Sequence, residues 1–576
     1  MKLINQNDYP DVIYVTKTKK PDYISGLSTT IATSGCGICC GMMIAEFFGY
    51  ELSLEDAIQI AYDYKANTSF GTKYKEYSLG LCDKFNLGCI RTDKKEEFRK
   101  ALEDGHCVLI NVGGDHDEHI GVFSHVGHYM LAIGIDGDTV KILDPGIEPN
   151  KYLEENRVGK VKVDGDFVYG NIDDLMKDVE NREYPFFIFY KLDKECNYIN
   201  IDKKIEELYP TFINIWKDVV SIESPTSYKQ GVDEVGKYFI DYGYRNLWDI
   251  DVLHNEVAGD AICLTMNSDV EGKPMVLSGH MDTVHPLGSY ATTLTEDKIY
   301  GPGCTDCKGG LIIALLVMKA LKECGYRDKK VMLLLQSDEE VGSRLSNHKT
   351  IDWMVEKSKD ASAFFNLEMN TTGTIVIIRK GIERFELKVT GVSAHSSMCY
   401  DGKNAICEAA HKIIELEKYK QEDGVTISCN IISGGTAVNT VPENCNVSID
   451  VRFSNEKERL EAEAYIKKVC ETSTIEGTTC TVEAIGTRKA MEYKDFNKVL
   501  VDKMNEIWIN NGIEPMKYRK ATGGSDAAYT TIAGIPTIDS IGARGGYIHT
   551  PREYGELISL KENSKRLACV IYDYKD

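Results

Sequence analysis

The sequence lacks any apolar run of about 18 residues, the length that a membrane-spanning helix needs. Residues 1–20 also lack the apolar centre of a secretion signal. The 18 cysteines are spread along a long chain, unlike the dense cysteines of small disulfide-stabilised domains. These absences argue against a membrane partner and predict a cytoplasmic protein with reduced thiols.

Positive charge is also in short supply. The chain has 67 lysines and arginines against 89 aspartates and glutamates, which gives a formal net charge of −22. A negative field of this size repels phosphate backbones, so we expect no nucleic-acid partner. The segment CTDC (304–307) is a lone cysteine pair without the second pair of a zinc ribbon.

The length of the chain and the order of its patterns predict three domains. Residues 1–195 have helical patterns first and short strands later, which indicates an α+β domain, and the polar residues 191–204 indicate a linker. Over 205–383 and 497–576 strands alternate with helices, as in a mostly parallel α/β sheet. Residues 384–496 interrupt this pattern with the order β-α-β-β-α-β of a ferredoxin-like domain.

One strand of the α/β region ends in three acids. The segment KKVMLLLQSDEEVGSR (329–344) is apolar up to Leu335 and then reaches Asp338, Glu339 and Glu340. A solvated strand end is one explanation. The other is a functional site, because α/β sheets bind ligands at the carboxyl ends of their strands.

Further potential metal ligands follow other strands of the same region. His280 and Asp282 stand two residues apart at a strand end, so their side chains share a face. Asp306 lies in a glycine-rich turn, Glu368 follows an apolar strand, and His549 lies in a loop. Each residue alone has an ordinary structural explanation, but the set matches a two-metal site. Two adjacent glutamates then have a reason: one binds metal and its neighbour acts as general base.

The blocks GHMDTV, GPGCTDCKGG, DEEVGS, VSAHSS, GGTAVNTVPENC and HTPREY occur in this order. They resemble the M20 metallopeptidases, most closely the glutamate carboxypeptidase branch, over residues 205–576. The resemblance implies an α/β zinc-exopeptidase domain interrupted by a lid or dimerisation domain. It also implies two zinc ions, with cobalt or manganese as alternatives. His280 and Glu368 would hold one ion, Glu340 and His549 the other, and Asp306 would bridge them.

The same resemblance implies the remaining roles. Glu339 would be the general base, and Asp282 would fix the imidazole of His280. His395 would stabilise the oxyanion, and in dimeric members of the family this histidine reaches the site of the partner subunit, which implies a homodimer. The terminal carboxylate of the substrate would be held by Asn439, Arg452 and the backbone near Gly524. A structural ion pair is the alternative for Arg452, and we expect Cys304 and Cys307 not to be ligands.

The first domain carries a possible second site. Cys36 precedes a helix, where a thiolate is favoured, His128 follows at the start of a strand, and Asp144 lies in the Asp-Pro of the next strand. Cys, His and Asp are the residues of a cysteine hydrolase. Residues 25–190 resemble the C39-like branch of papain-fold peptidases. The glutamine that this family has shortly before its cysteine is missing from residues 24–35, so backbone N–H groups or Ser34 would have to support the oxyanion.

The function indicated first is a zinc-dependent amidohydrolase or carboxypeptidase. It would cleave the amide bond before a C-terminal amino acid, glutamate being one candidate, in peptides or N-acyl amino acids. Two alternatives concern the first domain, which would be either the main peptidase or acyl transferase, or an inactive peptide-binding module. In a tandem enzyme the fusion would raise the effective concentration of the intermediate.

Overall fold

The computed structural model describes residues 1–14, 30–68, 71–192, 195–421 and 424–575. Residues 25–29 of the predicted papain-like domain lie outside this part. The chain divides into two compact units. Unit 1 comprises Met1–Asn200, Phe239–Ile250 and Lys319–Arg327, and unit 2 comprises Ile201–Tyr238, Asp251–Met318 and Asp328–Asp576. Among the described helices, none combines the length and apolarity needed to cross a membrane.

Unit 1 begins with helices, as its sequence predicts. Helix α3 starts after Ser53, whose hydroxyl accepts a hydrogen bond from the N–H of Asp56, the expected N-cap. The helices are η1 (Gln6–Asp8), α1 (Ile31–Ser34), α2 (Cys36–Phe47), α3 (Leu54–Asp63), α4 (Tyr74–Phe85), α5 (Lys95–Glu103) and α6 (Ile172–Asp178).

Unit 1 also contains a seven-stranded antiparallel sheet in the order β3-β9-β4-β5-β6-β8-β7. Alternate residues of β4 face two separate cores: Cys107 and Leu109 pack in one, Val108 and Ile110 in the other. The strands are β3 (Leu87–Thr92), β4 (Cys107–Val112), β5 (His128–Asp136), β6 (Thr139–Leu143), β7 (Val161–Asp164), β8 (Phe167–Asn171) and β9 (Phe186–Lys191); β1 (Asn67–Thr68) and β2 (Gly71–Thr72) form a separate pair.

The α/β region forms an eight-stranded sheet with the order β10-β11-β15-β12-β16-β25-β17-β24. Its central strands β15, β12, β16 and β25 are parallel, and every residue of them is buried. The strands are β10 (Asp249–Leu253), β11 (Ala261–Met266), β12 (Met275–His280), β15 (Val331–Gln336), β16 (Ala363–Asn366), β17 (Thr374–Arg379), β24 (Lys517–Ala521) and β25 (Thr537–Asp539).

The helices of this region and a smaller sheet complete the large domain. The predicted linker 191–204 is too long, because helix α7 already begins at Tyr198. The helices are α7 (Tyr198–Ser221), α8 (Lys229–Arg245), α9 (Lys308–Glu323), η2 (Glu339–Val341), α10 (Lys349–Ser358), α13 (Asp495–Asn510), α14 (Ala527–Ile532) and α15 (Leu557–Asp573); the smaller sheet contains β13 (Thr293–Leu294), β14 (Lys298–Tyr300), β26 (Gly545–Gly546) and β27 (Tyr554–Glu556).

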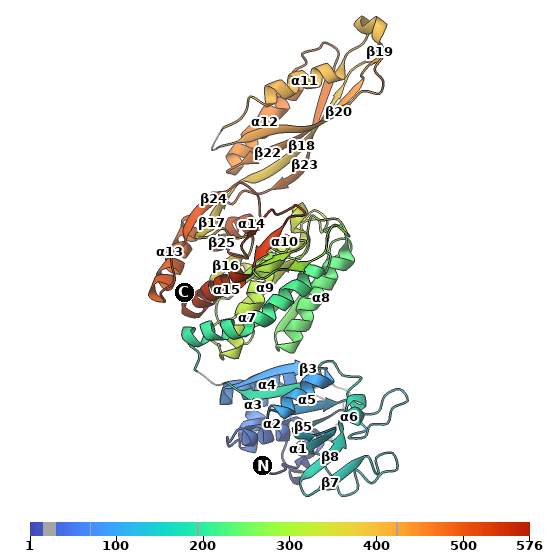
Figure 1. Cartoon of the computed structure of the whole chain (residues 1–576), viewed down its shortest axis with the longest axis vertical. Coiled ribbons are helices and arrows are strands. Elements are labelled where there is room, and N and C mark those ends of the chain that lie inside the picture. Colours follow the sequence, from blue (N-terminus) through green and yellow to red (C-terminus); the bar gives the residue numbers. More distant parts are fainter. Residues whose placement is uncertain (15–29, 69–70, 193–194, 422–423, 576) are drawn as a thin grey trace. The chain divides into compact units, whose positions relative to one another are not determined.

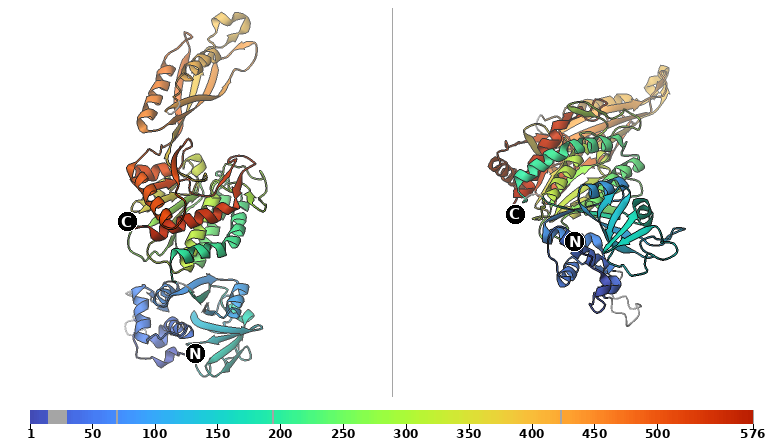
Figure 2. Two further views of the ribbon diagram at one scale, coloured as in Figure 1. Left: turned by 60° about the vertical axis from the view of Figure 1, so that its left-hand side comes forward. Right: turned by 60° about the horizontal axis from the view of Figure 1, so that its bottom comes forward.

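A small domain is inserted between β17 and α13. Its sheet has the order β20-β22-β18-β23 with antiparallel neighbours, and α11 and α12 lie side by side on one face of it (Figures 1 and 2). Its elements are β18 (Gly381–Thr390), β19 (Ala394–His395), η3 (Ser396–Asp401), α11 (Ala405–Leu416), β20 (Thr426–Gly434), β21 (Thr440–Val441), β22 (Asn444–Phe453), α12 (Glu456–Glu471) and β23 (Thr479–Arg488).

Strand register brings the predicted site residues to one edge of the large sheet. His280, the last residue of β12, pairs with Gln336, the last residue of β15, and Ser278 pairs with Asn366 at the end of β16. The loops that follow β15 and β16 carry Glu339, Glu340 and Glu368. Parallel strands end together, so these acids and the imidazole of His280 start from the same edge.

Candidate metal centre

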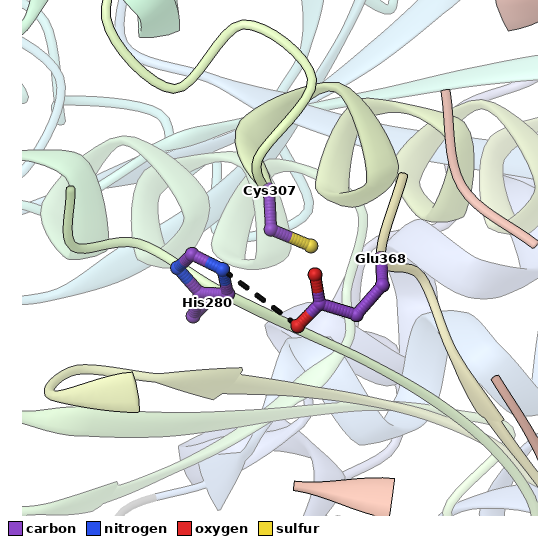
Figure 3. A group of neighbouring side chains, drawn as sticks. All are labelled: His280, Cys307 and Glu368. Carbon is purple, nitrogen blue, oxygen red and sulfur yellow. Dashed lines mark ion pairs between the residues drawn. The ribbon is translucent and has the colours of Figure 1, made fainter. Parts of the chain in front are cut away.

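Two imidazoles meet the carboxylate of Asp306, one on each oxygen. His280 Nε2 lies 3.1 Å from Asp306 Oδ1, and His549 Nε2 lies 3.1 Å from Oδ2. His280 Nε2 is also 3.8 Å from Glu368 Oε1 (Figure 3), and His549 Nε2 is 3.4 Å from Glu340 Oε2. The five side chains proposed as metal ligands therefore lie together, with Asp306 in the middle.

Asp282 orients its surroundings in two ways. The ring nitrogen Nδ1 of His280 lies 2.9 Å from the backbone carbonyl of Asp282, which leaves Nε2 to face Asp306. The carboxylate of Asp282 is fully buried and accepts hydrogen bonds from the N–H groups of Glu339 and Glu340, each at 3.1 Å. The Thr226 hydroxyl donates to it at 2.8 Å. Asp282 thus fixes the turn of the two glutamates as well as the histidine.

Sequence reasoning missed Glu553, which holds the glycine-rich turn. This buried carboxylate accepts hydrogen bonds from the N–H groups of Gly303, Thr305 and Asp306, at 3.2, 2.9 and 3.1 Å. His285 Nε2 lies 3.1 Å from it. The backbone that presents Asp306 is therefore fixed by an acid almost 250 residues further along the chain. The block HTPREY contains Glu553, but nothing in its spacing marks this contact.

The electrostatics of the cluster suit cations. Burial, followed by the charges of Asp306 and Glu339, raises the pKa of Glu368. Burial is also the main cause that raises the pKa of Glu340, to about 7. Hydrogen bonds to Asp306 and Glu340 raise the pKa of His549 to about 10. Closely packed acids with two imidazoles are the hard and borderline donors that divalent ions of the zinc type bind, so these residues fit a two-metal site.

Glu339 lies beside this cluster and pairs with an arginine of the small domain. Arg488 Nη1 is 2.5 Å from Glu339 Oε1, and Arg488 Nη2 donates to the Glu339 carbonyl. Glu339 is 5% exposed. Arg488 ends strand β23, far from any predicted motif, and sequence reasoning missed it.

A cavity of about 360 Å³ adjoins the cluster. Glu340 and His549 form part of its wall, and so do two of the predicted substrate-binding positions, Arg452 and Gly524. Three other arginines also line it: Arg344, Arg384 and Arg488. Arg452 is paired with Asp450, with Nε 2.6 Å from Oδ1 and Nη2 3.2 Å from Oδ2, the structural ion pair that was the alternative for this residue.

His395 and Asn439 do not line this cavity. The N–H of Ser396, next to His395, donates to the Asn439 carbonyl at 2.9 Å. Both residues are exposed and lie at the end of the small domain where β18 finishes at Thr390. The structure thus groups the predicted residues in two places, a metal cluster with its cavity and a separate pair on the small domain.

The first unit assembles its three predicted residues. Cys36 opens helix α2 and is hydrogen-bonded to His128, whose Nε2 lies 2.7 Å from Asp144 Oδ1. Burial opposes ionisation of Cys36, but His128 together with hydrogen bonds from the backbone of Tyr129 and Gly37 outweighs it, so the pKa of the thiol lies below its ordinary value. Burial likewise opposes the charged form of His128, but Asp144 and Cys36 together outweigh it, which raises the pKa of His128 to about 9.

Asp144 is held firmly. Besides His128, its carboxylate accepts hydrogen bonds from Lys151 Nζ at 2.6 Å, the Tyr152 hydroxyl at 2.7 Å and the Gly146 N–H at 2.9 Å. The loop before β5 contains His116, His119 and His125, and His119 is tied to the fold, because its Nε2 lies 2.7 Å from the buried Asp178. No described residue of this loop belongs to a cluster that could hold a metal ion.

Gln6 is a further candidate that sequence reasoning missed. Its Nε2 donates to the Ala32 carbonyl at 2.6 Å, one helical turn before Cys36, and its backbone N–H donates to the Pro145 carbonyl at 2.7 Å, next to Asp144. A glutamine amide therefore does lie between the segments of the cysteine and the aspartate, but it comes from residue 6 and not from residues 24–35.

Comparison with known proteins identifies the family of the large domain. Residues 276–573 match peptidase family M20/M25/M40, and the chain belongs to this family. Carboxypeptidase G2 of Pseudomonas sp. (strain RS-16) is 28% identical over 384 residues, which are 63% of this chain and 89% of the relative. Acetylornithine deacetylase of Buchnera aphidicola (Tuc7) is 24% identical over 289 residues, 46% of this chain and 73% of that protein.

Solved structures agree on the fold. A tripeptidase of Staphylococcus aureus has a TM-score of 0.54 at 22% identity and covers 63% of this chain and 98% of its own. The chain is accordingly a hydrolase of the metallopeptidase and amidohydrolase class. The family match starts at residue 276, so it does not cover residues 1–275, which include Cys36, His128 and Asp144.

The position of Asp282 generates a prediction. Asp282→Asn replaces one acceptor oxygen that receives the N–H of Glu339 or Glu340, so their turn loosens and His280 loses electrostatic support. We expect zinc affinity to fall by about 10–100-fold with the fold retained. Competition with a chelating dye measures the affinity, and circular dichroism monitors the fold. Glu296→Gln, at an exposed acid, is the matched control, and equal affinities for the two variants would contradict the role.

Proposed function

We propose that the large domain is a two-metal carboxypeptidase or amidohydrolase that removes a C-terminal amino acid from a peptide or N-acyl amino acid. The observation that carries this proposal is Asp306, whose two oxygens each face one imidazole. That arrangement suits a carboxylate shared by two cations. His280 and Glu368 would hold one cation, and Glu340 and His549 the other.

Zinc is the proposed metal, because two imidazoles and three carboxylates are ligands that zinc accepts readily. When bound, the cations supply Lewis acidity to the amide carbonyl and to the attacking water. The chain itself must then move a proton. Glu339 is next to a ligand but is not one of the clustered donors, so it is the group available to take the proton from water and return it to the leaving nitrogen. Arg488 holds its carboxylate in place.

The cavity supports an acidic leaving residue. Arg344, Arg384, Arg452 and Arg488 line a space beside Glu340 and His549. Arg452 and Arg488 have carboxylate partners at 2.6 and 2.5 Å, and Arg384 lies further from its partner, 3.8 Å from Asp450. Guanidinium groups bind carboxylates with two parallel hydrogen bonds. We therefore propose glutamate or a similar acid as the released residue, with its terminal carboxylate near Arg452 and the backbone of Gly524.

The test is release of free amino acids from dipeptides and N-acyl amino acids with acidic or neutral C-terminal residues. Glu339→Gln keeps the size of the side chain but removes the base, so turnover should fall by about 10²–10⁴-fold while two metal ions still bind. Glu296→Gln is the control. If Glu339→Gln retains most of the activity, the assignment of the base is wrong; if a chelator leaves the wild type active, the metal mechanism is wrong.

We further propose a homodimer formed through the small domain, with His395 and Asn439 serving the site of the partner. Strand β20 is an edge of its sheet, and Ile431 and Ile432 on it are 64% and 51% exposed. Near His395, Tyr400 and Val438 are almost entirely exposed. An unpaired edge with exposed apolar side chains is a surface that another chain can cover.

Mixing two inactive variants tests the shared site. Glu339→Gln lacks the base but supplies an intact His395, and His395→Ala has the base but lacks the histidine. If His395 acts across the dimer, mixed dimers contain one complete site, and activity should recover after subunit exchange. Size-exclusion chromatography with light scattering confirms that dimers form. A mixture as inactive as its components, in a sample that exchanges subunits, would refute the arrangement.

We propose a second function for unit 1, because Cys36, His128 and Asp144 are hydrogen-bonded in the order thiol, imidazole, carboxylate that a cysteine hydrolase requires. Asp144 occupies Nε2 of the imidazole, which leaves Nδ1 for the thiol. The side chain of Gln6 is the proposed oxyanion donor. The domain would be a papain-like peptidase or acyl transferase acting in tandem with the metal site; an inactive peptide-binding module is the alternative. A reactive thiol requires a reducing compartment, so the cytoplasm is the proposed location.

Alkylation by iodoacetamide, followed by mass spectrometry, tests the thiol. An ion pair of Cys36 with protonated His128 should make Cys36 react fast at neutral pH, and His128→Ala should move the onset of reaction to higher pH. Peptidase activity of this unit should decline as the pH rises through about 9, since His128 then loses its proton. Exposed Cys407 is the internal control. If Cys36 reacts no faster than Cys407, the unit is a binding module.

A further inference from the structure

The glycine-rich turn brings a sulfur to the metal cluster. Cys307 follows Asp306, and its Sγ forms a group with one nitrogen of His280 and one carboxylate oxygen of Glu368 in which all three atoms lie within 4.8 Å of one another. Figure 3 shows the thiol pointing toward the space between the imidazole and the carboxylate. The three residues come from the end of β12, the turn before α9 and the loop after β16.

The backbone around Cys307 Sγ leaves it little room to move. Cys307 is fully buried, and its Sγ lies 3.1 Å from the Leu367 carbonyl, the residue before Glu368. On the other side is Gly279, where a Cβ atom would come within 3.1 Å of the sulfur. Any side chain at position 279 would therefore crowd Sγ. The backbone of β12 thus leaves space for the sulfur directly beside His280.

Cys304 provides a contrast within the same turn. It is also fully buried, but its Sγ lies 3.7 Å from the Ile299 carbonyl and does not belong to either group of potential ligands among the described residues. The two cysteines of CTDC therefore differ: one faces the cluster and the other faces the packing between the turn and β14. The expectation that neither cysteine is a ligand is kept here for Cys304.

We propose that Cys307 is a thiolate ligand of the cation held by His280 and Glu368. This inference rests on the proposed two-metal site. On binding, the S–H bond breaks, its proton leaves to solvent, and sulfur donates an electron pair to the cation. A thiolate is a softer donor than carboxylate or imidazole, so this position takes zinc, cobalt(II) or cadmium in preference to manganese or magnesium. Among the described residues, the group of potential ligands that contains Glu340 has no cysteine, so the second position, with Glu340 and His549, keeps a harder preference.

Cobalt(II) absorption tests the ligand without relying on activity. The full-length chain, freed of metal under reducing conditions, is titrated with cobalt(II), and bound metal is counted after gel filtration. We expect two cobalt ions per chain and a thiolate-to-cobalt charge-transfer band in the near ultraviolet. Cys307→Ser should still bind two ions but lose the band, whereas Cys304→Ser should keep it. Cys36→Ser serves as the background, so that the reactive thiol of unit 1 does not contribute.

Metal preference gives a second measurement that holds even where one variant binds cobalt poorly. The ratio of cadmium to manganese affinity should fall by about 10-fold or more in Cys307→Ala and remain unchanged in Cys304→Ala. Two bound cobalt ions without a charge-transfer band, or a band that survives in Cys307→Ser, would overturn the thiolate ligand and leave the two-metal site standing. A chain that binds no cobalt would overturn both.

Discussion

Buried negative charge is the constraint on which the large domain depends. Asp306, Glu340 and Glu368 converge at one edge of the sheet, and bringing carboxylates together out of water is unfavourable unless positive charge meets them. Two imidazoles can supply part of that charge, and bound cations would supply the rest. The carboxylates of two further buried acids, Asp282 and Glu553, accept hydrogen bonds from backbone N–H groups of the same loops. Buried acids therefore have two roles in this domain: some are the proposed metal ligands, and others fix the backbone of the loops that carry those ligands.

The ligand cluster was predictable from sequence because its members follow strands whose ends must coincide. His280 and Gln336 pair in register, so the loops after β12 and β15 start side by side. Asp306 and His549 were predicted to lie with them because they occur in the blocks GPGCTDCKGG and HTPREY. Arg488 and Glu553 were not predictable in this way. Arg488 lies 149 residues from Glu339, and its neighbours form an ordinary strand pattern. A contact of this range depends on how two domains of the fold meet, and no local spacing encodes it.

In unit 1, too, the sequence predicted some residues of the candidate site and missed another. Cys36, His128 and Asp144 were predictable because each occupies the start of a helix, the start of a strand or the end of one. Gln6 was missed because its position was sought a few residues before the cysteine. The structure ties it by hydrogen bonds to Ala32 and Pro145 instead, which are far from it in sequence. A contact between residues so far apart in sequence depends on the fold, and no spacing around the cysteine indicates it.

The turn that carries Asp306 joins these observations into one argument. Its backbone is fixed by Glu553, so the two residues at its end, Asp306 and Cys307, cannot move independently. Asp306 lies beside both imidazoles, whereas Cys307, among the described potential ligands, forms a group with His280 and Glu368. A change at position 307 therefore acts on one half of the centre and leaves the shared carboxylate in place. One side chain beside an otherwise complete ligand set can in this way make two neighbouring cation positions chemically unequal.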